Sequence, residues 1–253
     1  MKPFTVNGTE LGAQEWRDAL FLRYGLEPPD LPKYCDGCND KFTICHALDF
    51  KRGGLVKARH NDVWDGIADL AGKSFTPSHV RDNPLIFAGC AMKRPKDNPD
   101  GTRGSTDQDG APLPEATEHK GDLLIRDLWK NWTDSVHDMR FVNTDAKTHA
   151  VKTPNNCLQE LDRGNKWMYL EACIQQRRHF SPFFAFVDGL LGVEATANLK
   201  RIASRLATKW RQPYSRTCGY FKSRISITLV RATHRCIRGY RVPAHRSSVQ
   251  RSH

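Results

Sequence analysis

Two aspartates, Asp122 and Asp138, are the residues of this 253-residue chain best suited to hold a divalent metal ion. Asp122 precedes the apolar run LLI at 123–125, and Asp138 lies in a second apolar segment between Val136 and Phe141. A carboxylate among buried strand residues is costly unless a partner offsets its charge, and a divalent cation is a common partner. The pattern predicts two adjacent strands that share one Mg²⁺ or Mn²⁺. Aspartates also often begin strands and end turns, and this structural role is the alternative.

A second group of residues has the composition of a zinc site. Cys35 and Cys38 flank an Asp-Gly turn, and His46 follows. Structural zinc takes four thiolate or imidazole ligands in a tetrahedron, so the pattern predicts a zinc knuckle with one ligand still to be found. The alternative is a pair of reduced cysteines at a turn beside a surface histidine.

Two residues could supply the fourth zinc ligand, Cys45 and His60. Cys45 is adjacent to His46, and neighbouring residues seldom reach one ion. His60 follows two glycines at 53–54, whose flexibility could fold the chain back toward the cysteines. We therefore favour His60 as the fourth ligand.

Positive charge is concentrated at the C-terminal end. The net charge is +11, yet the segment 195–253 contains fourteen of the 39 Lys and Arg residues and none of the 28 Asp and Glu residues. A segment of one sign attracts phosphate groups and makes binding sensitive to salt. We expect contact with DNA or RNA through basic residues of this segment: Arg216, Lys222, Arg224, Arg231, Arg235 and Arg238. The alternative is a solvated basic helix and tail.

Apolar periodicity predicts the elements that must position these residues. Helices are predicted over residues 10–25, 58–72, 157–178, 193–210 and 217–239. The last of these contains the β-branched run ISITLV, which would also suit a strand. Strands are predicted around 75–87, in the two aspartate-bearing segments and over 180–187. This order predicts an α/β fold of the α+β type, with a small mixed sheet and helices packed on its faces.

Composition divides the chain into residues 1–57, which hold the first helix and the knuckle-like segment, 58–210, and the basic helix and tail at 211–253. Residues 93–120 have almost no apolar content and are expected to form a loop insertion. No apolar run reaches the roughly 20 residues of a membrane span, and the N-terminus lacks the apolar core of a signal peptide. Eight cysteines then indicate a reducing compartment. We expect an intracellular protein, and the basic tail could serve nuclear import.

Several segments resemble a known family. They include ELGAQEWRDALFLRYGLEPPDLP, CDGC…HALDFKRGGLVKARHND, FTPSHVRDNPLI, RDLWKNWTDSVHDMRFVNTDAK, MYLEACIQQRRHFSPF and QPYSRTCGY…RATHRCIRG. Together they are similar to the C-terminal region of reverse transcriptases from eukaryotic non-LTR-type retroelements. There a cysteine–histidine knuckle precedes a restriction-endonuclease-like domain. The resemblance covers nearly the whole chain outside 93–120.

The resemblance implies a metal-dependent endonuclease of the PD-(D/E)XK type on an αβββαβ core, with Asp122 and Asp138 as the ligands of Mg²⁺ or Mn²⁺. Arg140 would stand in the place of the usual lysine. Asp62 would supply a further acid. The resemblance also implies that Lys166 and Tyr169 would approach the phosphate.

The chain departs from the family pattern at several positions. Phe50 stands where related sequences carry a cysteine, which puts the fourth zinc ligand in doubt. Arg140 stays protonated and therefore cannot act as a general base. Gly164 interrupts a predicted helix, and no Phe/Tyr-x-Asp-Asp polymerase motif occurs. Two hypotheses stay open: a metal-dependent endonuclease that cleaves phosphodiester bonds, and a catalytically inactive nucleic-acid-binding remnant of a reverse transcriptase polyprotein.

Overall fold

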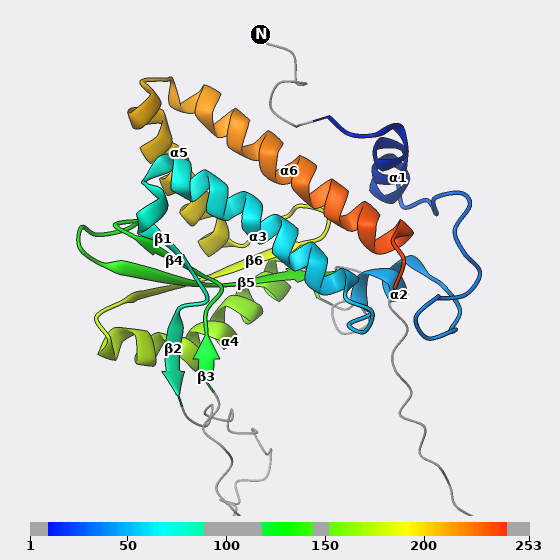
Figure 1. The fold of residues 1–253 in the computed structure, drawn as a ribbon, viewed down its shortest axis with the longest axis horizontal. Helices are drawn as coiled ribbons and strands as arrows, with labels where there is room; N and C mark the ends of the chain where they lie inside the picture. Colours follow the sequence, from blue (N-terminus) through cyan, green and yellow to red (C-terminus); the bar gives the residue numbers. More distant parts are fainter. Residues whose placement is uncertain (1–9, 89–117, 144–151, 242–253) are drawn as a thin grey trace, which may run out of the picture.

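A four-stranded sheet with helices on both faces forms the centre of the molecule (Figure 1). The computed structural model describes residues 10–88, 118–143 and 152–241. The strand order is β1 (Val80–Asp82), β4 (Leu123–Arg126), β5 (Asp134–Val142) and β6 (His179–Phe186). The first three strands pair antiparallel, and β6 runs parallel to β5. The predicted small mixed sheet is confirmed.

Alternation along β5 separates two faces of the sheet. Met139 packs into the core formed with α3, α5 and α6, whereas Val136 packs into the core on the side of α4. Because side chains alternate along a strand, Asp138 points to the same side as Val136. Strand β6 is apolar on both faces because helices cover both, and its Pro182 is tolerated at the edge of the sheet.

Three long helices cover one face of the sheet. They are α3 (Leu55–Ser74), α5 (Val193–Trp210) and α6 (Tyr214–Arg238), and α3 and α6 lie side by side (Figure 1). Their shared core includes Ile67, Leu206 and Leu229 together with Leu123 of β4. The run ISITLV is therefore helical. Residues of α6 belong to this core, so the basic helix after residue 210 packs on the main body.

A single helix, α4 (Pro154–Gln175), covers the other face (Figure 1). Tyr169 and Cys173 of α4 pack against Leu124, Val136 and Phe180. The helix is continuous through Gly164, which is buried. Tertiary packing thus outweighs the low helix propensity of this glycine.

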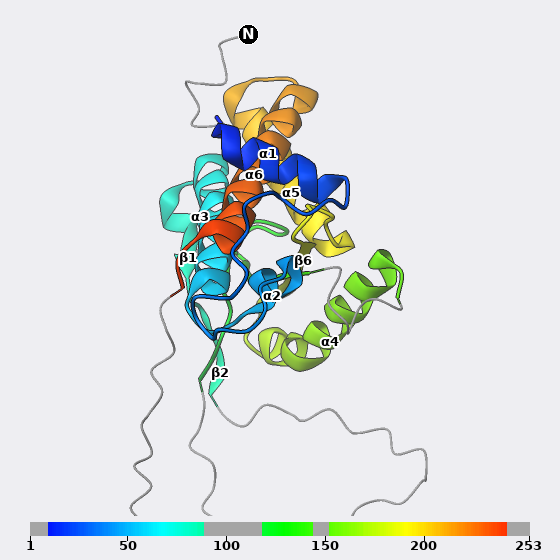
Figure 2. The same cartoon turned by 90° about the vertical axis from the view of Figure 1, so that its right-hand side faces the viewer.

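The N-terminal segment lies against the C-terminal end of α6 (Figure 2). It contains α1 (Ala13–Arg23) and the short helix α2 (Ile44–Asp49). Leu48 of α2 shares a small apolar core with Cys236 and Ile237 of α6. The knuckle-like segment is therefore attached to the main body through α6.

Two short strands form a separate antiparallel ribbon, β2 (Leu85–Ala88) and β3 (Glu118–Lys120). Strand β3 lies within the segment predicted to be a loop over 93–120, so that prediction is wrong at its C-terminal end. Residues 93–117 lie outside the described part. None of the helices in the described ranges is long and apolar enough to cross a membrane.

Candidate metal centres and active site

Asp122 is held at the point where the chain enters β4. Its N–H donates to the carbonyl of His137 at 2.8 Å, and its Oδ2 accepts from the N–H of Met139 at 2.5 Å. Gly121 permits this close crossing, because a β-carbon there would lie 2.6 Å from Val136 Cγ1. The Asp122 carboxylate is thereby fixed beside the part of β5 that follows His137, where β5 is not paired with β4.

Helix α3 closes this site from the other side. Trp64 Nε1 donates to the carbonyl of Asp122 at 3.1 Å. His60 Nε2 lies 3.1 Å from the carbonyl oxygen of Met139 and 3.4 Å from Asp122 Oδ2. The hydrogen bond with Asp122 raises the pKa of His60, although burial opposes the rise. His60 therefore belongs with Asp122 and supports the charge of that carboxylate.

Asp138 is the more deeply buried of the two acids, with 14% of its side chain exposed. Asn165 of α4 donates to its Oδ2, and Arg140 Nε lies 3.3 Å from the same atom. Burial raises the pKa of Asp138, the charge of Asp122 adds to the rise, and Arg140 and Asn165 oppose it. A neighbouring negative charge of this kind disfavours ionisation of Asp138 and would favour a nearby cation.

Tyr169 of α4 shares this neighbourhood. Burial raises the pKa of its phenol, and the charges of Asp138 and Asp122 contribute to the rise. Tyr169 thus lies within electrostatic reach of both aspartates, and its approach to a phosphate stays a prediction. A residue absent from the prediction, Asn165, also contacts Asp138, and only the packing of α4 on the sheet identifies it.

Two predicted site residues lie elsewhere. Asp62 forms an ion pair with Arg235 of α6 at 2.8 Å, because successive helical residues turn by about 100° and position 62 faces away from His60 and Trp64. Lys166 forms an ion pair with Glu194 of α5. Neither residue has a recorded contact with Asp122 or Asp138, so the predictions that Asp62 and Lys166 join the acid site are not supported.

The cysteine–histidine group is present as a compact cluster that could hold a metal ion. One ligand atom each of Cys35, Cys38 and His46 lie within 4.8 Å of one another, and Cys38 Sγ is 3.4 Å from His46 Nε2. His46 is fixed because Thr43 caps α2 by accepting its N–H at 3.0 Å. Within the described ranges this is the one group of three or more Cys, His, Asp or Glu residues that meets this distance.

His60 does not join the cluster, and the prediction that it is the fourth zinc ligand is wrong. Helix α3 begins at Leu55 and carries His60 to Asp122. The ring of Phe50 stacks on His46 instead, with centroids 4.9 Å apart. A β-carbon at Gly37, between the two cysteines, would lie 2.9 Å from the edge of that ring. An aromatic side chain therefore occupies the space beside the three ligands.

Most of the basic residues predicted to contact nucleic acid are paired with acids of the same chain. The pairs are Arg224–Asp69 at 3.6 Å, Arg231–Glu15 at 3.9 Å, Arg235–Asp62 at 2.8 Å and Arg238–Asp18 at 2.9 Å. Helices α1 and α3 thus supply the negative charge that the C-terminal sequence lacks. Arg216 Nη1 donates to Oε1 of Gln212 at 3.1 Å, in the connection that precedes α6.

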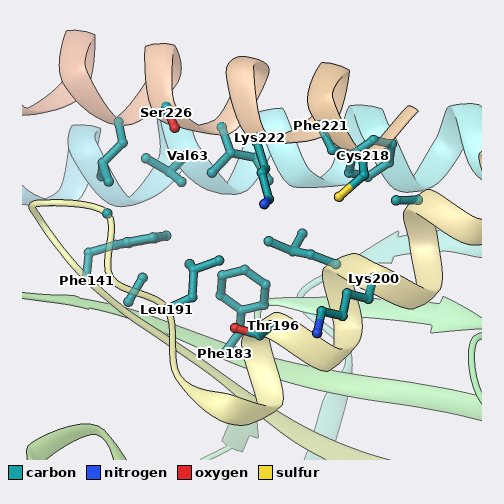
Figure 3. A pocket seen from close by; sticks show the side chains of 16 residues that line it. Val63, Phe141, Phe183, Leu191, Thr196, Lys200, Cys218, Phe221, Lys222 and Ser226 are labelled. Atoms are coloured by element: carbon teal, nitrogen blue, oxygen red, sulfur yellow. The ribbon is translucent and has the colours of Figure 1, made fainter. Parts of the chain in front are cut away.

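Lys222 faces an apolar cavity of about 350 Å³ between α5, α6 and the ends of β5 and β6. Figure 3 shows Lys222 of α6 directed toward this space, which Lys200, Phe141, Phe183 and Phe221 also line. Lys222 therefore lies at the mouth of this cavity, and its side chain is exposed to solvent. The cavity contains no carboxylate and has no chemical likeness to the Asp122–Asp138 site.

Comparison with known proteins gives no match: no protein-family model and no curated protein matches this sequence. The function is therefore argued from the geometry of the two clusters.

Proposed function

We propose that this chain is a nucleic-acid-binding protein derived from a non-LTR-type retroelement reverse transcriptase, and that Asp122 and Asp138 form the site of a metal-dependent endonuclease. One observation carries the proposal. The two aspartates come from neighbouring strands, their charges interact, and Arg140 follows Asp138 after one residue. The order α3, β1, β4, β5, α4, β6 supports the proposal, because it resembles the αβββαβ order of the PD-(D/E)XK core once the separate ribbon of β2 and β3 is left out.

The donor set suits a hard divalent cation. Each aspartate uses Oδ2 for its hydrogen bonds, and Oδ1 of either carboxylate has no recorded hydrogen bond to the described residues. These oxygens would hold Mg²⁺ or Mn²⁺, and water would complete the coordination. When bound, the cation lowers the pKa of a coordinated water and offsets charge on the phosphate. Among the described residues, no third Cys, His, Asp or Glu, including His60, lies close enough to form a three-ligand group with Asp122 and Asp138.

The surrounding residues supply charge and proton transfer. Arg140 keeps its positive charge and would stabilise the negative charge that develops on the phosphate. The Tyr169 phenol would donate a hydrogen bond to a phosphate oxygen. The hydrogen bond with Asp122 raises the pKa of His60, and its imidazole would be the group here that exchanges a proton with water.

The cysteine–histidine cluster would bind zinc through Cys35, Cys38 and His46, with water as the fourth ligand. This metal would stabilise the N-terminal segment and take no part in cleavage.

A catalytically inactive binding remnant is the second candidate. The observation that favours it is Arg140, since an arginine cannot replace the lysine of the motif as a base. DNA and RNA are both open as substrates.

A nicking assay separates these candidates. Supercoiled plasmid and a labelled RNA are incubated with the full chain and Mn²⁺, and the products are compared with those of Asp138→Asn. We expect metal-dependent cleavage that falls on the order of 100-fold or more in Asp138→Asn. Asp134→Asn, on the same strand and paired with Arg126, is the control and should keep the activity. If the unsubstituted chain binds but cuts neither polymer, the inactive remnant is the correct account.

A further inference from the structure

A second pocket lies where the end of α3 meets α5. Its volume is about 460 Å³, and it is lined by residues from α5, from the end of α3 and from the following turn η2 (Pro77–His79). Three cations of α5 dominate the lining: Arg201, Arg205 and Lys209. The remaining polar lining is mostly hydroxyl groups, from Ser74, Thr76, Ser204 and Thr208, with His79 beside them.

Helix geometry aligns the three cations. They follow one another at intervals of four residues, so each is about 6 Å farther along the axis on the same stripe. The adjacent stripe, which includes Ile202 and Leu206 about 100° around the helix, is buried in the core. Helix α5 is therefore fixed by its apolar face and presents its cations outward.

Contacts with the backbone hold these cations in place and leave donors free. Lys209 Nζ donates to the carbonyls of Lys73 and Phe75, at 2.7 and 2.6 Å. Arg201 Nε donates to the carbonyl of Leu128 at 2.9 Å, which leaves its two terminal amino groups available. The Arg205 guanidinium lies 5.1 Å from the centre of the Phe75 ring, which leaves its N–H edge available.

The charge balance distinguishes this pocket from α6. Arg201, Arg205 and Lys209 form no ion pair with any residue of the described chain, whereas the arginines of α6 are largely paired. The acid near the pocket is Asp127, which is paired with His79 at 3.2 Å and accepts the N–H of Trp132. The pocket therefore has an excess of positive charge and of hydrogen-bond donors.

We propose that this pocket binds phosphate groups of a nucleic-acid backbone. Guanidinium groups, an ammonium group and hydroxyl groups are the side chains that contact phosphate oxygens in protein–nucleic acid complexes. The phenylalanine of the lining, Phe75, is buried, and the His79 ring is paired with Asp127, so the proposed contact is with the backbone and does not read sequence. That the polymer is a nucleic acid rests on the proposed function; the affinity for phosphate rests on the pocket alone. Helix α5 thereby replaces α6 as the expected contact surface.

Binding is measured with the full chain by fluorescence anisotropy of short labelled DNA and RNA, without added Mg²⁺ or Mn²⁺ and over a range of salt concentrations. The double variant Arg201→Gln/Arg205→Gln is expected to bind about tenfold more weakly or worse. The slope of log affinity against log salt should fall by about two, one for each lost phosphate contact. The control Arg216→Gln/Lys222→Gln removes the same charge from α6 and should bind like the unsubstituted chain.

Ser204→Asp provides a second variant that adds a negative charge to the pocket and removes no recorded contact, so it keeps the test decisive if the double variant fails to fold. Equal weakening by the α5 and α6 pairs, or weakening by the α6 pair alone, would overturn the proposal. The proposal would also be overturned if the pocket binds inorganic phosphate but none of the α5 variants changes the affinity for nucleic acid. Without added Mg²⁺ or Mn²⁺, binding is measured in the absence of cleavage. We expect Asp138→Asn to lose cleavage and to keep this binding, so the two proposals can fail separately.

Discussion

Phe50 determines how many ligands the cysteine–histidine cluster can offer. Its ring stacks on His46 and fills the space beside Cys35 and Cys38. We predict that Phe50→Cys completes a four-ligand site and tightens zinc binding by an order of magnitude or more, because each thiolate adds a large share of the binding free energy. Competition with a chromophoric chelator measures the affinity.

Phe50→Ser is the matched control for that prediction. It removes the same ring and has nearly the same size as cysteine but supplies no thiolate. Equal zinc affinity in Phe50→Ser and Phe50→Cys would mean that the space beside His46, and not the missing ligand, limits binding.

The contrast between His60 and the two aspartates indicates what spacing alone can predict. Asp122 and Asp138 come together because adjacent strands pair in a fixed register, and strands could be recognised from the sequence. The sequence favours His60 as a zinc ligand, but the structure places it beside Asp122. Its distance along the chain from His46 does not indicate where α3 positions its side chain. The sequence also predicted a helix from residue 58, so the helical position of His60 was the signal that could have corrected the assignment.

At the scale of elements, α6 holds the N-terminal segment through a buried ion pair. Asp18 of α1 is 1% exposed, and its carboxylate accepts from both Arg238 and His234 of α6. Burial alone would raise the pKa of Asp18, but the hydrogen bonds and charges of Arg238 and His234 outweigh it and lower the pKa. Arg238 is therefore a structural residue in this fold.

We predict that Asp18→Ala lowers the free energy of unfolding by about 3 kcal/mol, because it leaves the largely buried Arg238 guanidinium without a carboxylate and with only the backbone carbonyls of Pro29 and Asp30 as acceptors. Urea unfolding followed by circular dichroism measures the change. Arg216→Ala, at an exposed position of the same helix, should change stability by less than about 0.5 kcal/mol. A similar small effect in both variants would refute the structural role assigned to this ion pair.

Periodicity was sufficient to predict the elements but not the partners of their charges. Residues 193–210 were predicted as a helix with the bounds that the structure gives α5, because its apolar positions repeat at helical spacing. The arginines of α6 were predicted to contact nucleic acid because nearby sequence contains no acid. Their acids come from α1 and α3, and only tertiary packing reveals that pairing.

At the scale of the whole molecule, a buried histidine in the sheet ties stability to pH. His137 is 1% exposed on β5, and burial, with a smaller contribution from the charge of His179, lowers its pKa to about 3. The folded state therefore keeps a neutral imidazole, while the unfolded chain binds a proton below the ordinary pKa of 6.5. Stability is complete above 6.5 and is lost as the pH falls toward 3, by about 1.4 kcal/mol per pH unit.

We predict that His137→Leu removes this acid sensitivity. Between pH 7 and pH 5 the free energy of unfolding of the unsubstituted chain should fall by about 2 kcal/mol more than that of His137→Leu. Urea titrations at the two pH values give the difference. His79→Gln, which replaces a half-exposed histidine, is the control and should resemble the unsubstituted chain; identical pH dependence of His137→Leu and the unsubstituted chain would contradict the assignment.

The central claim is that Asp122 and Asp138 hold one cation between neighbouring strands. Electron paramagnetic resonance of Mn²⁺, titrated into the full chain in the absence of nucleic acid, tests it directly. We predict one bound Mn²⁺ at this site, which is lost in Asp122→Asn and lost equally in Asp138→Asn but retained in Asp134→Asn. Mn²⁺ binding that is unchanged in both variants, or that depends on one aspartate and not on the other, would contradict the shared site.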